Sequence, residues 1–194
     1  MTANPKILAF AGSTRMDSFN KRLIRIAVAG ARSAGGEVTL IDLRDFPLPL
    51  FDGDLESRDG LPPNGRKLKD LFLAHHGLLM SCPEYNSSIT GVWKNTIDWV
   101  SRPVPGEAPL ACFDGKVASI MSASPGALGG LRGLVHVRAI LQNIKVLVIP
   151  DQVAVSKANE AFNPDGSLKD PKQQAAAEKL GAKLAQVISK LHRE

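Results

Sequence analysis

ILAFAGSTRMDSFNKRL, residues 7–23, joins a short apolar run to a polar loop and then to a helical pattern. The run at residues 7–11 has the length of a strand. After the loop, apolar residues recur at intervals of three and four, at Leu23, Ile24, Ala27 and Val28. A buried strand that leads directly into a helix begins a βαβ unit, so this stretch predicts a parallel sheet with crossover helices.

The rest of the chain repeats the alternation of strand and helix. Five strands are expected, at Lys6 to Ala11, Glu37 to Asp42, Gly77 to Cys82, Lys116 to Ser122 and Lys145 to Ile149. Their interiors are nearly continuous apolar runs such as VASIM and KVLVI, which is typical of strands covered by helices on both faces. The sequence predicts a doubly wound α/β fold in three layers, with helices on both faces of a five-stranded parallel sheet.

The helices and connections complete this pattern. Helices are expected over Phe19 to Ala34, Gly65 to His75, Gly91 to Ser101, Gly130 to Gln142 and Pro171 to Leu191. Two connections, residues 44–64 and 151–170, are longer than a compact α/β unit needs. The first carries apolar side chains that must pack against another part of the protein. A Pro-Asp-Gly turn in the second predicts a small hairpin-like excursion.

Composition narrows the class of protein. A chain of 194 residues that is 44% hydrophobic suits one domain, residues 1–194. The net charge of +5 is spread without a basic block, so neither a nucleic-acid partner nor a membrane partner is expected. Cys82 and Cys112 form no CxxC pair and the first apolar run is too short for a signal peptide, which together indicate the cytoplasm.

Three polar loops follow the first, third and fourth expected strands: GSTRMDSFN, PEYNSSITG and SASPGALGG. Ligands of doubly wound sheets bind in the crevice beyond the carboxyl ends of the strands, where these loops would meet. All three are rich in hydroxyls, amides or glycines. Their convergence predicts a binding site at this edge.

The first loop has the chemistry of an anion site. Backbone amides at the start of a helix favour negative charge. Arg15 adds a positively charged guanidinium, whose paired donors suit a phosphate. The loop supplies uncharged donors at Ser13, Thr14, Ser18 and Asn20. It lacks GxxxxGK[ST] and GxGxxG, which disfavours a nucleoside triphosphate or a Rossmann-type dinucleotide. Taken alone, it is equally compatible with an ordinary polar turn in which Ser18 caps the helix.

The other two loops suit the ring of a ligand. Backbone amides of the third-strand loop would meet the polar edge of a flat ring, and Tyr85 would border its face. In the fourth-strand loop, glycines permit close backbone approach and either Ser122 or Ser124 can donate a hydrogen bond. The competing interpretation is that these glycines serve only the turn and helix packing.

Other catalytic signatures are missing from the sequence. There is no GxSxG elbow for a hydrolase and no HExxH. His75 and His76 are adjacent, which puts them on different faces of a helix. No metal site is expected.

GSTRMDSFNKRL and PEYNSSITGVWKNTIDWVSRP, in this order and at these distances, resemble the NADPH-dependent FMN reductase family. These are flavodoxin-like enzymes that include quinone, azo-dye and chromate reductases. The resemblance implies an oxidoreductase with tightly bound, non-covalent FMN and with NADPH or NADH as electron donor. The acceptor, a quinone-like molecule, an azo compound, chromate or free flavin, is left open because residues 44–64 and 108–114 match no family pattern.

The resemblance also implies site residues. Those implied to hold the FMN phosphate are Ser13, Arg15, Ser18 and Asn20, assisted by Thr14. Those implied to lie along the flavin ring and ribityl chain are Pro83, Glu84, Tyr85 and Asn86. The third side is implied to be closed by Ser124 and Gly126, with Ser122 as the alternative serine. A two-electron ping-pong cycle needs no protein acid or base, so no catalytic residue is named.

Family members are commonly homodimers or homotetramers with the flavin near the subunit interface. The resemblance therefore implies an interface on the helix that carries Trp93, Trp99 and Arg102. One alternative function is a flavodoxin-like electron carrier without turnover of nicotinamides, which the basic pI of about 9.4 disfavours because such carriers are usually acidic. Another is a phosphate-binding module that keeps the fold without a flavin.

Overall fold

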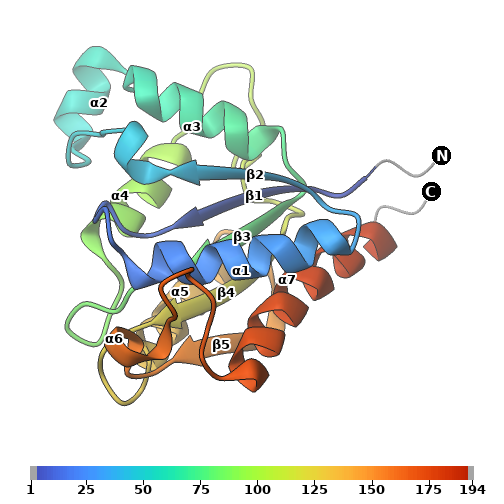
Figure 1. Cartoon of the computed structure of the whole chain (residues 1–194). Coiled ribbons are helices and arrows are strands. Elements are labelled where there is room, and N and C mark those ends of the chain that lie inside the picture. The colour runs from blue at the N-terminus through green and yellow to red at the C-terminus, as the bar shows by residue number, and fades with distance from the viewer. Residues whose placement is uncertain (1–3, 192–194) are drawn as a thin grey trace.

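The computed structural model describes residues 4–191, and its five strands form one parallel sheet in the order β2-β1-β3-β4-β5 (Figure 1). The strands are β1 (Lys6–Ala11), β2 (Glu37–Asp42), β3 (Gly77–Ser81), β4 (Val117–Ala123) and β5 (Leu147–Val155). The predicted doubly wound parallel sheet is confirmed, and its strand order is that of flavodoxin-like folds.

β5 is longer than the sequence predicts. The expected strand ends at Ile149, whereas β5 continues through Pro150 to Val155. Its pairing with β4 shifts register between Ala118 and Ile120, where the ladder is irregular. Proline is accommodated in strands at edges and irregularities, so the apolar pattern of this edge strand is split in two and only its first half is recognisable.

Helices cover both faces of the sheet (Figure 1). One layer holds α1 (Phe19–Ser33) and α7 (Pro171–Leu191), and the other holds α3 (Pro63–Leu73), α4 (Gly91–Val100) and α5 (Leu131–Asn143). Alternate side chains of β1 belong to different cores. Ile7 and Ala9 pack with α1 and α7, while Leu8 and Phe10 pack with α3, α4 and α5. Burial on both faces explains the continuous apolar strands.

The long connections contain short helices. The first holds a 3-10 turn at Leu43–Asp45 and α2 (Gly53–Asp59), and the second holds α6 (Ala158–Ala161). α2 buries none of its residues, so it has no apolar period that a sequence pattern would reveal. The predicted excursion is confirmed by an antiparallel bridge between Phe162 and Leu168.

The direction of winding reverses between β1 and β3, which are neighbours in the sheet. The crevice at this switch point is bordered by the loops after these two strands. Within residues 4–191, no helix is long and apolar enough to cross a membrane.

Candidate cofactor site

The loops after β1, β3 and β4 surround a hollow of about 90 Å³ at the carboxyl edge of the sheet. Of the residues named from the sequence, eight line it: Ser13, Arg15, Ser18, Asn20, Pro83, Glu84, Tyr85 and Ser124. Thr14 does not line it but lines a separate hollow. Asn86 and Gly126 lie in the same loops but outside this lining. The predicted meeting of three loops is therefore present.

The amino end of α1 opens onto this hollow. Ser18 occupies the N-cap position with extended backbone, at φ −86° and ψ 129°, but among the described residues its side chain makes no capping hydrogen bond. The first turn also carries no acidic residue. The first amides of a helix lack partners within the helix and favour an anion. The alternative of an ordinary turn capped by Ser18 is thus not what the structure shows.

Arg15 is held at the rim of the hollow. Its Nη2 donates to the carbonyl oxygen of Asp17 at 2.7 Å, and its guanidinium lies 5.8 Å from the ring centroid of Phe19. The Asp17 carboxylate forms an ion pair with Arg22 instead. Because another arginine pairs with that carboxylate, the charge of Arg15 is left to act on the hollow.

The side chain of Asn20 has a different role from the phosphate contact that the family resemblance implies. Its side chain is only 3% exposed, and Oδ1 accepts hydrogen bonds from Ser81 Oγ at 2.8 Å and from the Ala123 amide at 3.0 Å. Nδ2 donates to the Ala123 carbonyl oxygen at 2.8 Å. Asn20 therefore braces the start of α1 against the ends of β3 and β4, which leaves one amide hydrogen for a ligand.

A tight turn shapes the β3 loop. The amides and carbonyls of Tyr85 and Ser88 pair at 3.0 Å, while Asn86 and Ser87 between them have φ values of 50° and 66°. Two successive non-glycine residues in the left-handed region are costly and are found where the surrounding structure demands them, often at functional sites. The turn places the half-exposed ring of Tyr85 at the mouth of the hollow.

The Glu84 carboxylate is engaged with α5. Oε1 accepts from Arg132 Nε at 3.1 Å and Nη2 at 2.7 Å, and Oε2 accepts from the Gly133 amide at 3.0 Å. Burial by itself would raise the pKa of Glu84, but these donors hold the pKa below its ordinary value. Glu84 thus fixes the β3 loop to the first turn of α5, and both of its carboxylate oxygens are engaged there.

The structure separates the two candidate serines. Ser122 is fully buried, and its Oγ has no hydrogen-bond partner among the described residues. It faces Gly130, which has a φ of 91° and where an added Cβ would lie 2.0 Å from Ser122 Oγ. Ser124 borders the hollow. The serine that can meet a ligand is Ser124.

Several residues of the site were missed from the sequence. The hollow is also lined by Phe19, Ala123 and Pro125. Behind it, Thr90 caps α4 and donates to the Gly12 carbonyl oxygen at 2.7 Å, which ties the β1 loop to the β3 loop. Phe19 lies within the loop GSTRMDSFN and Pro125 within the loop SASPGALGG, so their place in these loops was the sequence signal for them. The hydrogen bond between Thr90 and Gly12 spans 78 residues, and no sequence motif indicates it.

The remaining reactive groups near the site are inert or scattered. Cys82, just before Pro83, is 2% exposed, and burial raises the pKa of its thiol. Among residues 4–191, no group of three or more acidic, histidine or cysteine side chains is placed to bind a metal ion.

Comparison with known proteins decides the family. Residues 5–160 match the model of the NADPH-dependent FMN reductase family. The chain belongs to this family. As a family member it is an oxidoreductase of the flavodoxin-like fold, and the expected dependence on FMN and NAD(P)H is confirmed at the level of the family.

The names of two relatives of this FMN reductase family member refer to the reduction of FMN or of quinones. An NAD(P)H-dependent FMN reductase of Pseudomonas aeruginosa is 35% identical over 173 residues, covering 89% of both chains. A quinone reductase of Escherichia coli is 33% identical over 149 residues, covering 77% of this chain and 76% of the relative.

Two solved structures extend the comparison. The flavoenzyme FerB, an NAD(P)H:acceptor oxidoreductase from Paracoccus denitrificans, superposes with a TM-score of 0.80 at 26% identity, over 97% of this chain and 98% of FerB. A flavodoxin from the domain Archaea has a TM-score of 0.64 at 10% identity, over 94% of this chain and 98% of the flavodoxin, which shows the shared fold.

Proposed function

We propose that this protein is an FMN-dependent NAD(P)H oxidoreductase that passes two electrons from a nicotinamide to a quinone-like acceptor or another small acceptor, such as an azo compound, chromate or free flavin. The observation that carries the proposal is the uncapped amino end of α1, which opens onto a hollow lined by Ser13, Arg15 and Ser18. Quinone reductases among the relatives favour a quinone over the other acceptors.

The residues present fit FMN. Ser13, Arg15, Ser18 and the first amides of α1 would hold the phosphate, and the small hollow of about 90 Å³ suits that end of the molecule. Whole ligands of this size fill larger sites, so the ring would lie along the open edge formed by Pro83, Tyr85 and Asn86 on one side and by Ser124 and Gly126 on the other. Thr14 would contribute its backbone.

When bound, FMN supplies the hydride and electron transfer. The protein's part is to position the ring and to stabilise negative charge with backbone amides of the β3 and β4 loops. The Glu84 carboxylate is held by Arg132 and the Cys82 thiol is buried, so neither group would exchange a proton with a bound substrate. Donor and acceptor would occupy the same opening in turn, which is a ping-pong cycle.

We also propose that the enzyme is a homodimer or homotetramer with the site near the subunit interface. Tyr85 is 55% exposed at the mouth of the site, and an aromatic ring left uncovered there suits contact with a ligand or another subunit. Free, buried Cys82 and Cys112 support a reducing compartment such as the cytoplasm.

The test is flavin spectroscopy on the purified full chain. We expect visible flavin absorbance after reconstitution with FMN, bleaching on anaerobic addition of NADPH or NADH, and recovery of colour with a quinone. A protein that does not take up FMN would contradict the proposal. A stable flavin complex that neither nicotinamide bleaches would indicate the electron-carrier alternative, and intersecting instead of parallel double-reciprocal plots would exclude the ping-pong cycle.

A further inference from the structure

A second hollow at the carboxyl edge of the sheet lies between α1 and β2. It has a volume of about 240 Å³ and shares no lining residue with the candidate cofactor site. Its lining includes Ala11 and Lys21, the residues directly before and after the first loop. The strand order puts this hollow on one side of β1 and the loops after β3 and β4 on the other side (Figure 1). A ligand that reached both sites would cross the first loop.

The hollow has an apolar wall because β2 is an edge strand. Leu40 of β2 lines it and is 38% exposed, while Ile24 of α1 and Ala11 of β1 are 2% and 3% exposed and form its base. Its volume of about 240 Å³ is below the roughly 300–1,000 Å³ of sites that enclose whole drug-sized ligands. The hollow therefore suits one flat ring with a short polar extension.

A nearly buried ion pair forms part of the polar side of the hollow. Lys21 Nζ lies 2.5 Å from Asp42 Oδ2, and Lys21 is 9% exposed. Asp42 is the last residue of β2, and its Oδ1 accepts a hydrogen bond from the Arg44 amide at 3.0 Å. A carboxylate has about four acceptor positions, so these two contacts fix Asp42 and leave it able to accept from a ligand.

Two further charged residues of the lining are Arg25 on α1 and Asp45 in the 3-10 turn after β2. Both are exposed, and among residues 4–191 neither side chain forms a hydrogen bond or an ion pair. A guanidinium presents paired donors to a phosphate, and a carboxylate accepts from hydroxyl or amino groups. The hollow thus offers one cation and one anion to a ligand.

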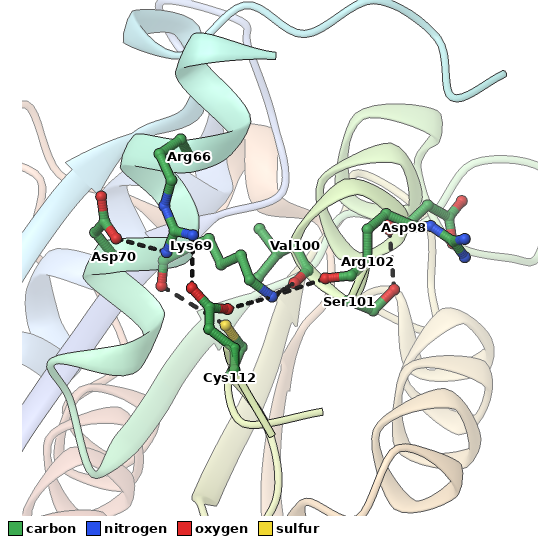
Figure 2. A network of polar contacts seen from close by, with 9 residues as sticks. Arg66, Lys69, Asp70, Asp98, Val100, Ser101, Arg102 and Cys112 are labelled. Atoms are coloured by element: carbon green, nitrogen blue, oxygen red, sulfur yellow. Dashed lines mark hydrogen bonds and ion pairs between the residues drawn. The ribbon is translucent and has the colours of Figure 1, made fainter. Parts of the chain in front are cut away.

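The charged groups between α3 and α4 differ in this respect. Figure 2 shows the nearly buried Lys69, whose Nζ donates to the carbonyl oxygens of Val100 at 3.2 Å and Arg102 at 2.8 Å. Its Nζ also lies 3.2 Å from the Glu107 carboxylate, which accepts from Arg66 at 2.6 Å. These charges are paired within the chain and hold its segments together, so that cluster leaves little for a ligand.

The hollow between α1 and β2 has the chemistry that an adenylate group needs. In nucleotide sites of βαβ units, an acidic side chain near the end of the second strand accepts a hydrogen bond from the adenosine ribose. Asp42 occupies that position, and the apolar wall suits the face of an adenine ring. The GxGxxG loop that holds a pyrophosphate in such units is missing, which agrees with the assignment of the amino end of α1 to the phosphate of FMN.

We propose that this hollow binds an adenylate group, with the ribose hydroxyls donating to Asp42 and Asp45 and the phosphate accepting from Arg25. The inference rests on the proposed function, because that function supplies two molecules with such a group. One is the NAD(P)H donor, whose adenylate half would lie here while its nicotinamide meets the flavin ring. The other is FAD, whose flavin half would take the place of FMN.

The test titrates the FMN-reconstituted full chain with 5′-AMP by calorimetry, so that FMN blocks the amino end of α1. For Arg25→Ala we expect a dissociation constant at least about 10-fold higher than for wild type, because a hydrogen bond to a charged group is lost. Arg32→Ala is the matched control, since Arg32 is an exposed arginine of α1 outside the lining. Absence of AMP binding, or equal dissociation constants for the two variants, would overturn the proposal.

Photolabelling tests the location. Light-activated 8-azido-AMP, followed by mass spectrometry of the peptides, should label residues 21–25 or 40–45, which contain the charged part of the lining. Excess 5′-AMP should suppress this label. A label confined to other segments would refute the site.

Two further measurements distinguish the sources of the adenylate group. If the source is the donor, 5′-AMP should compete with NADPH or NADH, and Arg25→Ala should raise the KM for the donor about 10-fold without changing kcat. If the source is FAD, the apoprotein should bind FAD more tightly than FMN, and Arg25→Ala should remove that difference. Uptake of FMN and its bleaching by a nicotinamide report separately on the proposed function; a chain that took up no FMN but was photolabelled at this hollow would contradict that function alone.

Discussion

Asn20 and Ala123 lie 103 residues apart and exchange two hydrogen bonds, one of 2.8 Å from Nδ2 to the Ala123 carbonyl and one of 3.0 Å from the Ala123 amide to Oδ1. Ser81 Oγ donates to the same Oδ1 at 2.8 Å. One buried side chain thereby joins the helix after the first loop to the strand ends from which the other two loops begin. We therefore expect the spacing of the three loops to depend on this brace.

Replacing Asn20 with alanine should reduce the free energy of unfolding by about 2–4 kcal/mol, because the amide and carbonyl of Ala123 would be left buried without their partners. The flavin dissociation constant should rise as well, since the three loops lose their common brace. Urea unfolding and flavin fluorescence measure the two effects. Asn159→Ala, at an exposed position, is the control, and a variant as stable as that control would disprove the role of the brace.

Arg15→Ala should weaken FMN binding by about 1.5–3 kcal/mol, the contribution of a hydrogen bond to a charged group. Arg25→Ala is the matched control, because Arg25 is an exposed arginine on α1 that lines a different hollow. Fluorescence titration of the apoprotein gives both dissociation constants. If the two variants bind FMN equally well, Arg15 does not hold the phosphate.

Ser124→Ala and Ser122→Ala should differ in their effect on flavin binding. Loss of the Ser124 hydroxyl is expected to weaken flavin binding by about 0.5–1.5 kcal/mol. Loss of the buried, unpartnered Ser122 hydroxyl should leave binding unchanged and should not lower stability, because no hydrogen bond is broken. Reduced flavin affinity in Ser122→Ala alone would reverse our assignment.

Gly130→Ala should destabilise the fold by about 2–4 kcal/mol, since Gly130 combines a φ of 91° with a contact of 2.0 Å between an added Cβ and Ser122 Oγ. Gly126→Ala should change stability by less than about 0.5 kcal/mol, because among the described residues an added Cβ there meets only Ser124 Oγ, at 3.7 Å. Adding Ser122→Gly to Gly130→Ala should recover part of the loss. Thermal and urea unfolding compare the three variants, and equal stability of the two single variants would contradict the packing argument.

Glu84→Gln should lower stability at neutral pH by about 1 kcal/mol, a modest cost because the paired Arg132 side chain is 57% exposed. The folded pKa of Glu84 lies below its ordinary value, so the carboxylate stabilises the fold above the ordinary pKa and loses this effect as pH falls through the folded pKa. The difference between wild type and variant should therefore shrink on acidification. Urea midpoints from neutral to acidic pH test this, with exposed Glu37→Gln as a control; a difference that does not vary with pH would contradict it.

The strands were the most predictable part of the fold. β1 begins and ends where its apolar run predicts, because an interior strand covered by helices on both faces needs an unbroken apolar segment. The edge strand β2 also has the predicted bounds, although polar residues interrupt its apolar ones and none of its residues is buried. α2 and the second half of β5 were not predictable. α2 buries no residue, and β5 is interrupted at Pro150 opposite an irregular part of β4, so neither keeps a regular period.

The candidate site was predictable in its location and in most of its members, but not in their roles. A motif shows that Asn20, Glu84 and Ser122 are close to the site along the chain. It does not show that Asn20 braces β3 and β4, that the Glu84 carboxylate binds α5, or that Ser122 is buried under Gly130. Each of these depends on a partner 8 to 103 residues away.

The sequence by itself determined the alternation of strands and helices, the three polar loops at one edge of the sheet and the family, because apolar period and loop chemistry are local properties of the chain. Only the tertiary structure decided which side chains face the hollow and which ones brace it. Hydrogen-bond partners and burial are set by contacts between segments distant in the chain, and no local pattern specifies those contacts.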